Sequence, residues 1–274
     1  MAKSRAKVIS MAERKDIPLG LIGMVHLKAL PGSPNYSGDL DYVEAIAIAD
    51  AQALIAGGVA GIMVENFGDV PFFKDRVPTI TITAMTRIIR SIVELSDIPV
   101  GVNVLRNDAK AAISIAAATG AKFIRVNVHI GAMQTDQGII EGLASETLRL
   151  RENLGPGIAI LADVGVKHAA AIDEDWTLEQ ESRDCWHRGL ADALIISGKG
   201  TGMSTKIEDL VIVKNAVPDA PLIIGSGVNM DNATAYLEHA ASLIVGTSLK
   251  IDSSVEKAVD LQRVTEFTSL VINS

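Results

Sequence analysis

Two carboxylates and a histidine stand directly after apolar runs of the sequence. Glu65 follows Gly-Ile-Met-Val, Asp163 follows Ile-Ala-Ile-Leu-Ala, and His26 follows Gly-Leu-Ile-Gly-Met-Val. Carboxylates and imidazoles can donate and accept protons, and such groups at strand ends are typical of general acid/base catalysis. We therefore predict that Glu65, Asp163 and His26 are catalytic. The alternative is structural: a carboxylate can brace a loop, and a histidine can be buried and hydrogen-bonded.

Amide and positively charged side chains stand near the ends of other apolar runs. Asn103 and Asn127 can donate to or accept from substrate hydroxyl and carbonyl groups. Arg106 and Lys167 can neutralise an anionic substrate, and His168 stands beside Lys167. We predict that these five residues bind the substrate.

Two turns of small residues follow the last two apolar runs, with the sequences Gly-Ser-Gly and Gly-Thr-Ser. Small residues let backbone N–H groups approach a phosphate, and the N-terminus of a following helix adds positive potential. We predict a phosphate site here, and the alternative is that both are merely tight turns. Lys199 lies in a further glycine-rich turn that lacks the spacing of a P-loop. The predicted phosphate-binding residues are Gly225, Ser226, Gly227, Gly246, Thr247 and Ser248.

A metal site would have to combine histidines with the strand-end carboxylates. His26, His129, Glu65 and Asp163 are the available ligands, but no His-x-His pair follows the first apolar run. We therefore expect neither a metal nor another cofactor. Arg125 lies two residues before Asn127, so the alternation of a strand predicts that both face the same side.

The candidate residues share one setting, because they follow eight short apolar runs. Runs of this length are typical of parallel strands buried on both faces, and the segments between them can each hold a helix. Eight such units predict an α/β fold with a single (β/α)8 barrel (TIM barrel), whose active site lies at the carboxyl ends of the strands. The runs begin at residues 20, 61, 100, 123, 158, 193, 222 and 243.

The segments between the strands predict the helices and the loops. Four loops after strands, at 26–38, 66–78, 129–142 and 164–176, are long enough to cover a small-molecule site. We predict one domain over residues 1–274, in which 1–19 form an extension with a short helix at 7–16. Helices are predicted at 39–56, 108–119, 143–153, 177–188, 205–216, 230–239 and 255–271, and one more is predicted to begin at a cap formed by Thr79 or Thr81.

Composition excludes several classes of protein. The chain has 274 residues, 48% of them hydrophobic, and a net charge of −8, which argues against nucleic acid as a partner. No apolar stretch approaches the roughly 18–20 residues that span a membrane. The one cysteine, Cys185, is expected to pack in a helix and is typical of a reducing compartment. We expect a cytoplasmic protein without a secretory signal, with an organelle transit peptide in the basic first 20 residues as the alternative.

Several segments resemble the BtpA/SgcQ family, and the resemblance extends over residues 17–270. It implies a ribulose-phosphate-binding type of barrel. It also indicates eight site residues, without assigning their roles: His26, Glu65, Asn103, Arg106, Asn127, Asp163, Lys167 and His168. Gly200 and Ser253 depart from the family pattern, where Ala and Gly are expected. The family includes a photosystem I accumulation factor and proteins encoded among sugar-uptake genes. The matching segments are 24–34, 64–72, 101–108, 125–129, 135–142, 162–168 and 245–250.

These observations predict an enzyme that acts on a phosphorylated sugar or a related small metabolite by acid/base isomerase or aldolase/lyase-type chemistry. The first alternative is a non-catalytic assembly factor, which would need an exposed apolar patch outside the barrel mouth to bind a protein. The second alternative is a metal-dependent hydrolase. A homo-oligomer is compatible with the sequence.

Overall fold

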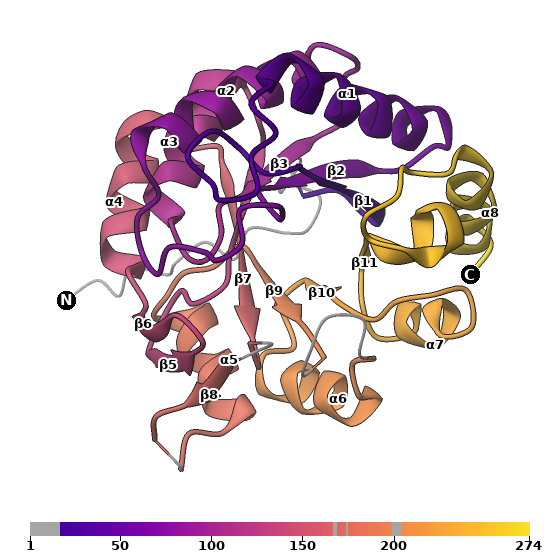
Figure 1. Ribbon diagram of the computed structural model, residues 1–274. Helices are drawn as coiled ribbons and strands as arrows, with labels where there is room; N and C mark the ends of the chain where they lie inside the picture. The colour runs from indigo at the N-terminus through magenta and orange to yellow at the C-terminus, as the bar shows by residue number, and fades with distance from the viewer. Residues whose placement is uncertain (1–16, 167–168, 174, 199–203) are drawn as a thin grey trace.

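Eight parallel strands form a closed barrel, and helices surround it (Figure 1). The computed structural model describes residues 17–166, 169–173, 175–198 and 204–274. The eight predicted strands and the predicted fold class are therefore confirmed. The barrel strands are β1 (Gly20–His26), β2 (Gly61–Glu65), β3 (Val100–Asn103), β4 (Phe123–Val126), β7 (Ala159–Val164), β9 (Ala193–Ile196), β10 (Leu222–Ile224) and β11 (Ser242–Val245).

The strands are apolar throughout because both of their faces are buried. In β1, Leu21 and Val25 belong to the core beneath the helices, whereas Ile22 and Met24 belong to the cluster that fills the barrel. Phe123 lies in register with Gly101 of the neighbouring strand β3, and a Cβ atom on that glycine would lie 2.1 Å from the phenyl ring. The glycine thus leaves the space that the phenyl ring occupies. The strand order around the barrel is β1-β11-β10-β9-β7-β4-β3-β2.

The helices follow the predicted segments, with differences at their ends. Asp39, Asp108 and Thr177 each accept a hydrogen bond from an amide of the first turn, as N-caps do. The predicted cap at Thr79 or Thr81 is wrong, because Pro78 precedes that helix and no side chain caps it. The helices in the described ranges are α1 (Leu40–Ala56), α2 (Thr79–Val93), α3 (Ala109–Thr119), α4 (Ala144–Leu154), α5 (Leu178–His187), α6 (Ile207–Ala216), α7 (Ala233–Leu237) and α8 (Leu261–Ile272).

Helices α7 and α8 are shorter than predicted. Asp260 caps α8 by accepting hydrogen bonds from two of its amides. The helix therefore begins at Leu261, six residues after the predicted start at 255. Residues 255–260, which were predicted to be helical, form a turn and an extended stretch that follow two short 3-10 turns at 247–249 and 251–253. Lys250 pairs with Val259, and this bridge closes the segment into a loop beside the barrel mouth.

A small antiparallel sheet stands where the sequence predicted only loops. It consists of β5 (Ala132–Thr135), β6 (Gly138–Glu141) and β8 (Ala169–Ala171), drawn at the lower left of Figure 1. Met133 and Ile140 bury one of its faces in a cluster of their own. Strands of three or four residues with one partly exposed face leave a weak hydrophobic pattern, which explains why the sequence did not indicate them.

Two further sequence predictions concern the rest of the chain. Cys185 is buried in α5, as expected. The helix predicted at 7–16 lies outside the described residues. Within the described ranges, none of the helices combines the length and apolar character needed to cross a membrane.

Candidate active site

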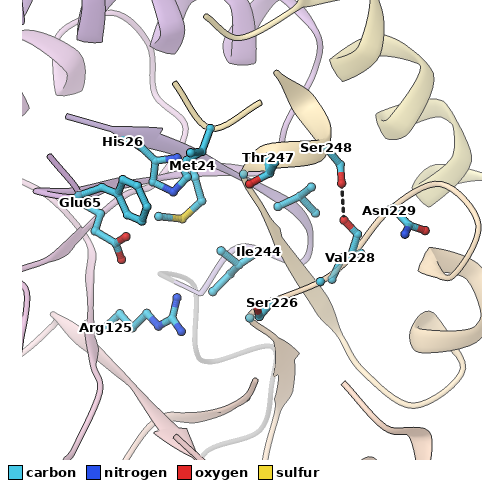
Figure 2. A pocket seen from close by; sticks show the side chains of 16 residues that line it. Met24, His26, Glu65, Arg125, Ser226, Val228, Asn229, Ile244, Thr247 and Ser248 are labelled. Atoms are coloured by element: carbon cyan, nitrogen blue, oxygen red, sulfur yellow. Dashed lines mark hydrogen bonds between the residues drawn. The ribbon is translucent and has the colours of Figure 1, made fainter. Parts of the chain in front are cut away.

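A cavity of about 170 Å³ opens at the carboxyl ends of the barrel strands. Figure 2 shows His26 and Glu65 on one side of it, Thr247 and Ser248 on the other, and Arg125 and Ser226 at the bottom of the view. Candidate proton-transfer groups therefore face the predicted phosphate turns across one small space.

The register of the barrel brings four polar side chains to one level. His26 pairs with Glu65, Glu65 with Asn103, and Asn103 with Arg125 in successive neighbouring strands. Asn103 Nδ2 donates to Glu65 Oε2 at 2.5 Å. This bond holds one carboxylate oxygen of Glu65, while the Glu65 side chain lines the cavity. The phenyl ring of Phe67 packs on the imidazole of His26, with ring centroids 4.8 Å apart.

A buried ion pair lies next to the cavity. Arg125 Nε and Nη2 donate to the two carboxylate oxygens of Asp163, both at 2.9 Å, and Asn127 Nδ2 donates to Asp163 Oδ2 at 2.9 Å. The side chains of Arg125 and Asp163 are only 2% and 0% exposed. Arg125 Nη2 also donates to Ser197 Oγ at 3.3 Å. Asp163 therefore holds Arg125 in place, and Arg125 rather than Asp163 lines the cavity.

The guanidinium groups of Arg125 and Arg106 respond differently to burial. For Arg125, burial opposes the charged form, but the attraction and hydrogen bonds of Asp163, with a contribution from Glu65, raise the pKa above its ordinary value. For Arg106, burial outweighs the attraction of Asp163 and Glu65, and the positive charge of Arg125 adds to it, so the pKa is lowered. Arg106 is thus within electrostatic reach of both carboxylates without lining the cavity.

Close packing explains the glycines of the two predicted phosphate turns. A Cβ atom on Gly225 would lie 2.4 Å from Ile195 Cγ2, and one on Gly246 would lie 2.6 Å from His26 Cε1. Gly227 has φ +68°, a conformation that glycine adopts most readily. All six residues of the turns line the cavity. Ser248 Oγ donates to the carbonyl oxygen of Val228 at 2.6 Å and so ties the two turns together.

The other candidate residues do not line this cavity or lie outside the residues that the structure describes. His129 is buried, and its Nε2 lies 2.8 Å from the carbonyl oxygen of Gly189; burial lowers its pKa. In the ranges that the structure describes, no group of three or more His, Cys, Asp or Glu side chains could hold a metal ion. Lys167, His168 and Lys199 lie outside the described residues.

Arg125 was predicted to face the same side as Asn127 but was not predicted to be a site residue. The signal was available, because a charged residue inside an otherwise apolar buried strand needs a partner. Met24, Phe67 and Val255 also line the cavity and were not predicted. They are apolar, so nothing in the sequence distinguished them from ordinary core residues.

Comparisons with known proteins agree on a family and on a fold. The model of the BtpA family matches residues 18–273. The photosystem I biogenesis protein BtpA of Synechocystis is 48% identical over 90% of this chain and 86% of its own length. An uncharacterized protein of Thermococcus kodakarensis is 46% identical over 91% of this chain and 94% of its own length.

Among solved structures, N-(5'-phosphoribosyl)anthranilate isomerase from Pyrococcus furiosus superimposes with a TM-score of 0.54 and 15% identity. That match covers 93% of this chain and 100% of the isomerase. The native KDPGal structure superimposes with a TM-score of 0.56 and 13% identity, over 93% of both chains. At such identities these likenesses establish the fold alone.

Proposed function

The chain belongs to the BtpA family, and on that premise we propose that it is an enzyme that acts on a phosphorylated sugar or a related small metabolite. The reaction is of the acid/base isomerase or aldolase/lyase type. One observation carries the proposal: His26 and Glu65 line the same cavity as both predicted phosphate turns. A substrate with its phosphate in the turns would present its carbon chain to these two side chains.

The phosphate end of the substrate lies between the turns that follow β10 and β11. The hydroxyl groups of Ser226 and Thr247 line the cavity there, and the lack of side chains at the glycines lets the backbone approach closely. Arg125 adds a guanidinium group to the lining of the cavity. Asp163 balances most of the positive charge of Arg125. The guanidinium group therefore orients the substrate through hydrogen bonds more than it attracts the substrate by its charge.

The proton-transfer groups are Glu65 and His26 in this proposal. Glu65 keeps one carboxylate oxygen outside its bond to Asn103, and it faces the cavity. Asp163 acts through Arg125, because its two oxygens already accept three hydrogen bonds from Arg125 and Asn127. A carboxylate held in this way is a poor base, since protonating it would disrupt the buried ion pair. Asn103 and Asn127 position the two carboxylates.

Calorimetric titration with ribose 5-phosphate tests the phosphate site. Replacing Thr247 by Glu places a negative charge on the cavity wall, and we expect the affinity to fall at least about tenfold, or 1.4 kcal/mol. Thr265→Glu is the matched control, because it adds the same charge on the exposed face of α8 and should leave the affinity unchanged. Equal binding by both variants, or no binding to the wild type, would refute the phosphate site.

A non-catalytic role in assembly is the second candidate function. It is supported by the name of the Synechocystis relative and by the exposed apolar side chains of Val70 and Phe73 in the loop after β2. In that case phosphorylated sugars should not bind. Replacing Phe73 by Ala would instead weaken binding to the protein partner. The titration above therefore distinguishes the two candidates.

A further inference from the structure

A second cavity, of about 460 Å³, adjoins the first beside His26 and Phe67. The two cavities share His26, Phe67 and Val255 as lining residues. The first cavity alone is smaller than the roughly 300–1,000 Å³ of typical small-molecule sites, whereas the second falls within that range. We propose that they form one bipartite cleft, and that the second cavity binds a flat, uncharged ring at the far end of a phosphorylated sugar. The inference rests on the proposed function and names the substrate class.

The lining of the second cavity is suited to a flat ring. Phe67 and Tyr42 contribute aromatic side chains, and Leu27 and Val70 add aliphatic ones. Tyr42 stands in the first turn of α1 and is 55% exposed, so it has a large apolar surface for a ligand to cover. Aromatic side chains favour planar partners through stacked or edge-on contacts.

The charges of the second cavity argue against a second anionic group. Lys28 Nζ donates to the carbonyl oxygen of Glu256 at 2.9 Å and lies 3.5 Å from the Glu256 carboxylate. Lys28 and Glu256 both line the cavity, so their opposite charges offset each other there. Asn35 and Ser37 line the same space and supply neutral hydrogen-bonding groups. A neutral heterocycle with polar edges matches this lining, and a phosphate or carboxylate does not.

The position of His26 fits a substrate that spans both cavities. With the phosphate in the turns after β10 and β11 and the ring beside Tyr42, the sugar between them lies against the walls that the cavities share. His26 belongs to these walls, and Glu65 lines the phosphate side next to it. A phosphorylated sugar that carries a flat ring at its far end has this order of groups, and a nucleoside 5'-phosphate is a stable binding probe of that arrangement.

Calorimetric titration with three probes tests the inference. Ribose 5-phosphate supplies phosphate and sugar, uridine 5'-monophosphate adds an uncharged ring, and fructose 1,6-bisphosphate adds a second phosphate. We expect uridine 5'-monophosphate to bind at least about tenfold more tightly than ribose 5-phosphate. Tyr42→Ala should remove most of that advantage and leave ribose 5-phosphate affinity unchanged. Phe73→Ala is the matched control, because Phe73 is 56% exposed and lines neither cavity. This substitution should leave the affinities for ribose 5-phosphate and uridine 5'-monophosphate unchanged.

The outcomes separate this inference from the proposed function. If ribose 5-phosphate binds, Thr247→Glu weakens it and uridine 5'-monophosphate binds no more tightly, the bipartite cleft is refuted and the proposed function stands. Tighter binding of fructose 1,6-bisphosphate than of uridine 5'-monophosphate would also refute the bipartite cleft. So would an equal loss of affinity for ribose 5-phosphate and for uridine 5'-monophosphate in Tyr42→Ala. If no probe binds the wild type, the proposed function itself fails.

Discussion

At the scale of single residues, the pair Arg125–Asp163 sets the electrostatics of the barrel mouth. The sequence placed Asp163 at a strand end and Arg125 on the same side of its strand as Asn127, but it did not indicate that Asp163 and Arg125 bind each other. Their pairing depends on the register between β4 and β7, which brings Arg125 opposite Leu161, two residues before Asp163. Register between strands far apart in the chain leaves no local sequence signal. The positions were therefore predictable and the partnership was not.

The burial of this pair predicts a large effect of substitution. Asp163→Asn leaves the Arg125 guanidinium buried without its counter-charge, and we expect the free energy of unfolding to fall by about 3–5 kcal/mol. Urea denaturation measures the change. Asp41→Asn, which removes the exposed partner of Arg87, is the control and should cost about 0–1 kcal/mol. A similar small loss in both variants would show that Arg125 does not depend on Asp163 for its charge balance.

At the scale of elements, the strands and helices that could be predicted were those marked by an uninterrupted or periodic run of apolar residues. The eight barrel strands are buried on both faces and were all indicated by uninterrupted apolar runs. The sheet β5-β6-β8 and the 3-10 turns after β11 lack such runs, because their burial depends on a few contacts made in the folded state. The start of α8 was predicted too early, since Val255 belongs to the loop that lines the cavity.

Helix α5 carries a buried carboxyl group whose ionisation should control stability. Glu181 lies behind the loop after β7 and accepts a hydrogen bond from the amide of Gly165 at 3.2 Å. Burial, with a smaller effect of Asp163, raises its pKa to about 7. The folded state therefore holds a proton that the unfolded chain releases near pH 4.5, and stability is lost as the pH rises from about 4.5 to 7.

The Glu181→Gln variant tests this pH dependence. Glutamine cannot ionise, so the variant should lack a pH-dependent loss of about 3 kcal/mol in the free energy of unfolding that the wild type shows over this interval. Urea denaturation at pH 5 and pH 8 provides the comparison. Glu179→Gln, at an exposed position of the same helix, is the control and should keep the wild-type slope. Parallel pH profiles for wild type and Glu181→Gln would contradict the assignment.

At the scale of the whole molecule, the barrel determines where distant residues meet. His26, Glu65 and Gly246 are separated by tens to hundreds of residues in the chain, yet closure of the strands brings them to one mouth. The strand-end rule predicted this convergence from the sequence. It could not predict the second cavity, because that space is shaped by loop conformations and by the contact of Lys28 with Glu256.

Hydrogen–deuterium exchange at substrate carbon tests the central claim most directly. Both isomerase and aldolase chemistry remove a proton from carbon or return one to it, so a bound phosphorylated aldose or ketose should incorporate deuterium in D2O. Proton NMR over a panel of pentose and hexose phosphates would follow the loss of the C–H signal. We expect deuterium incorporation with the wild type and a rate at least about 100-fold lower with Glu65→Gln. Sugar phosphates that bind but never exchange, or equal exchange in both proteins, would contradict it.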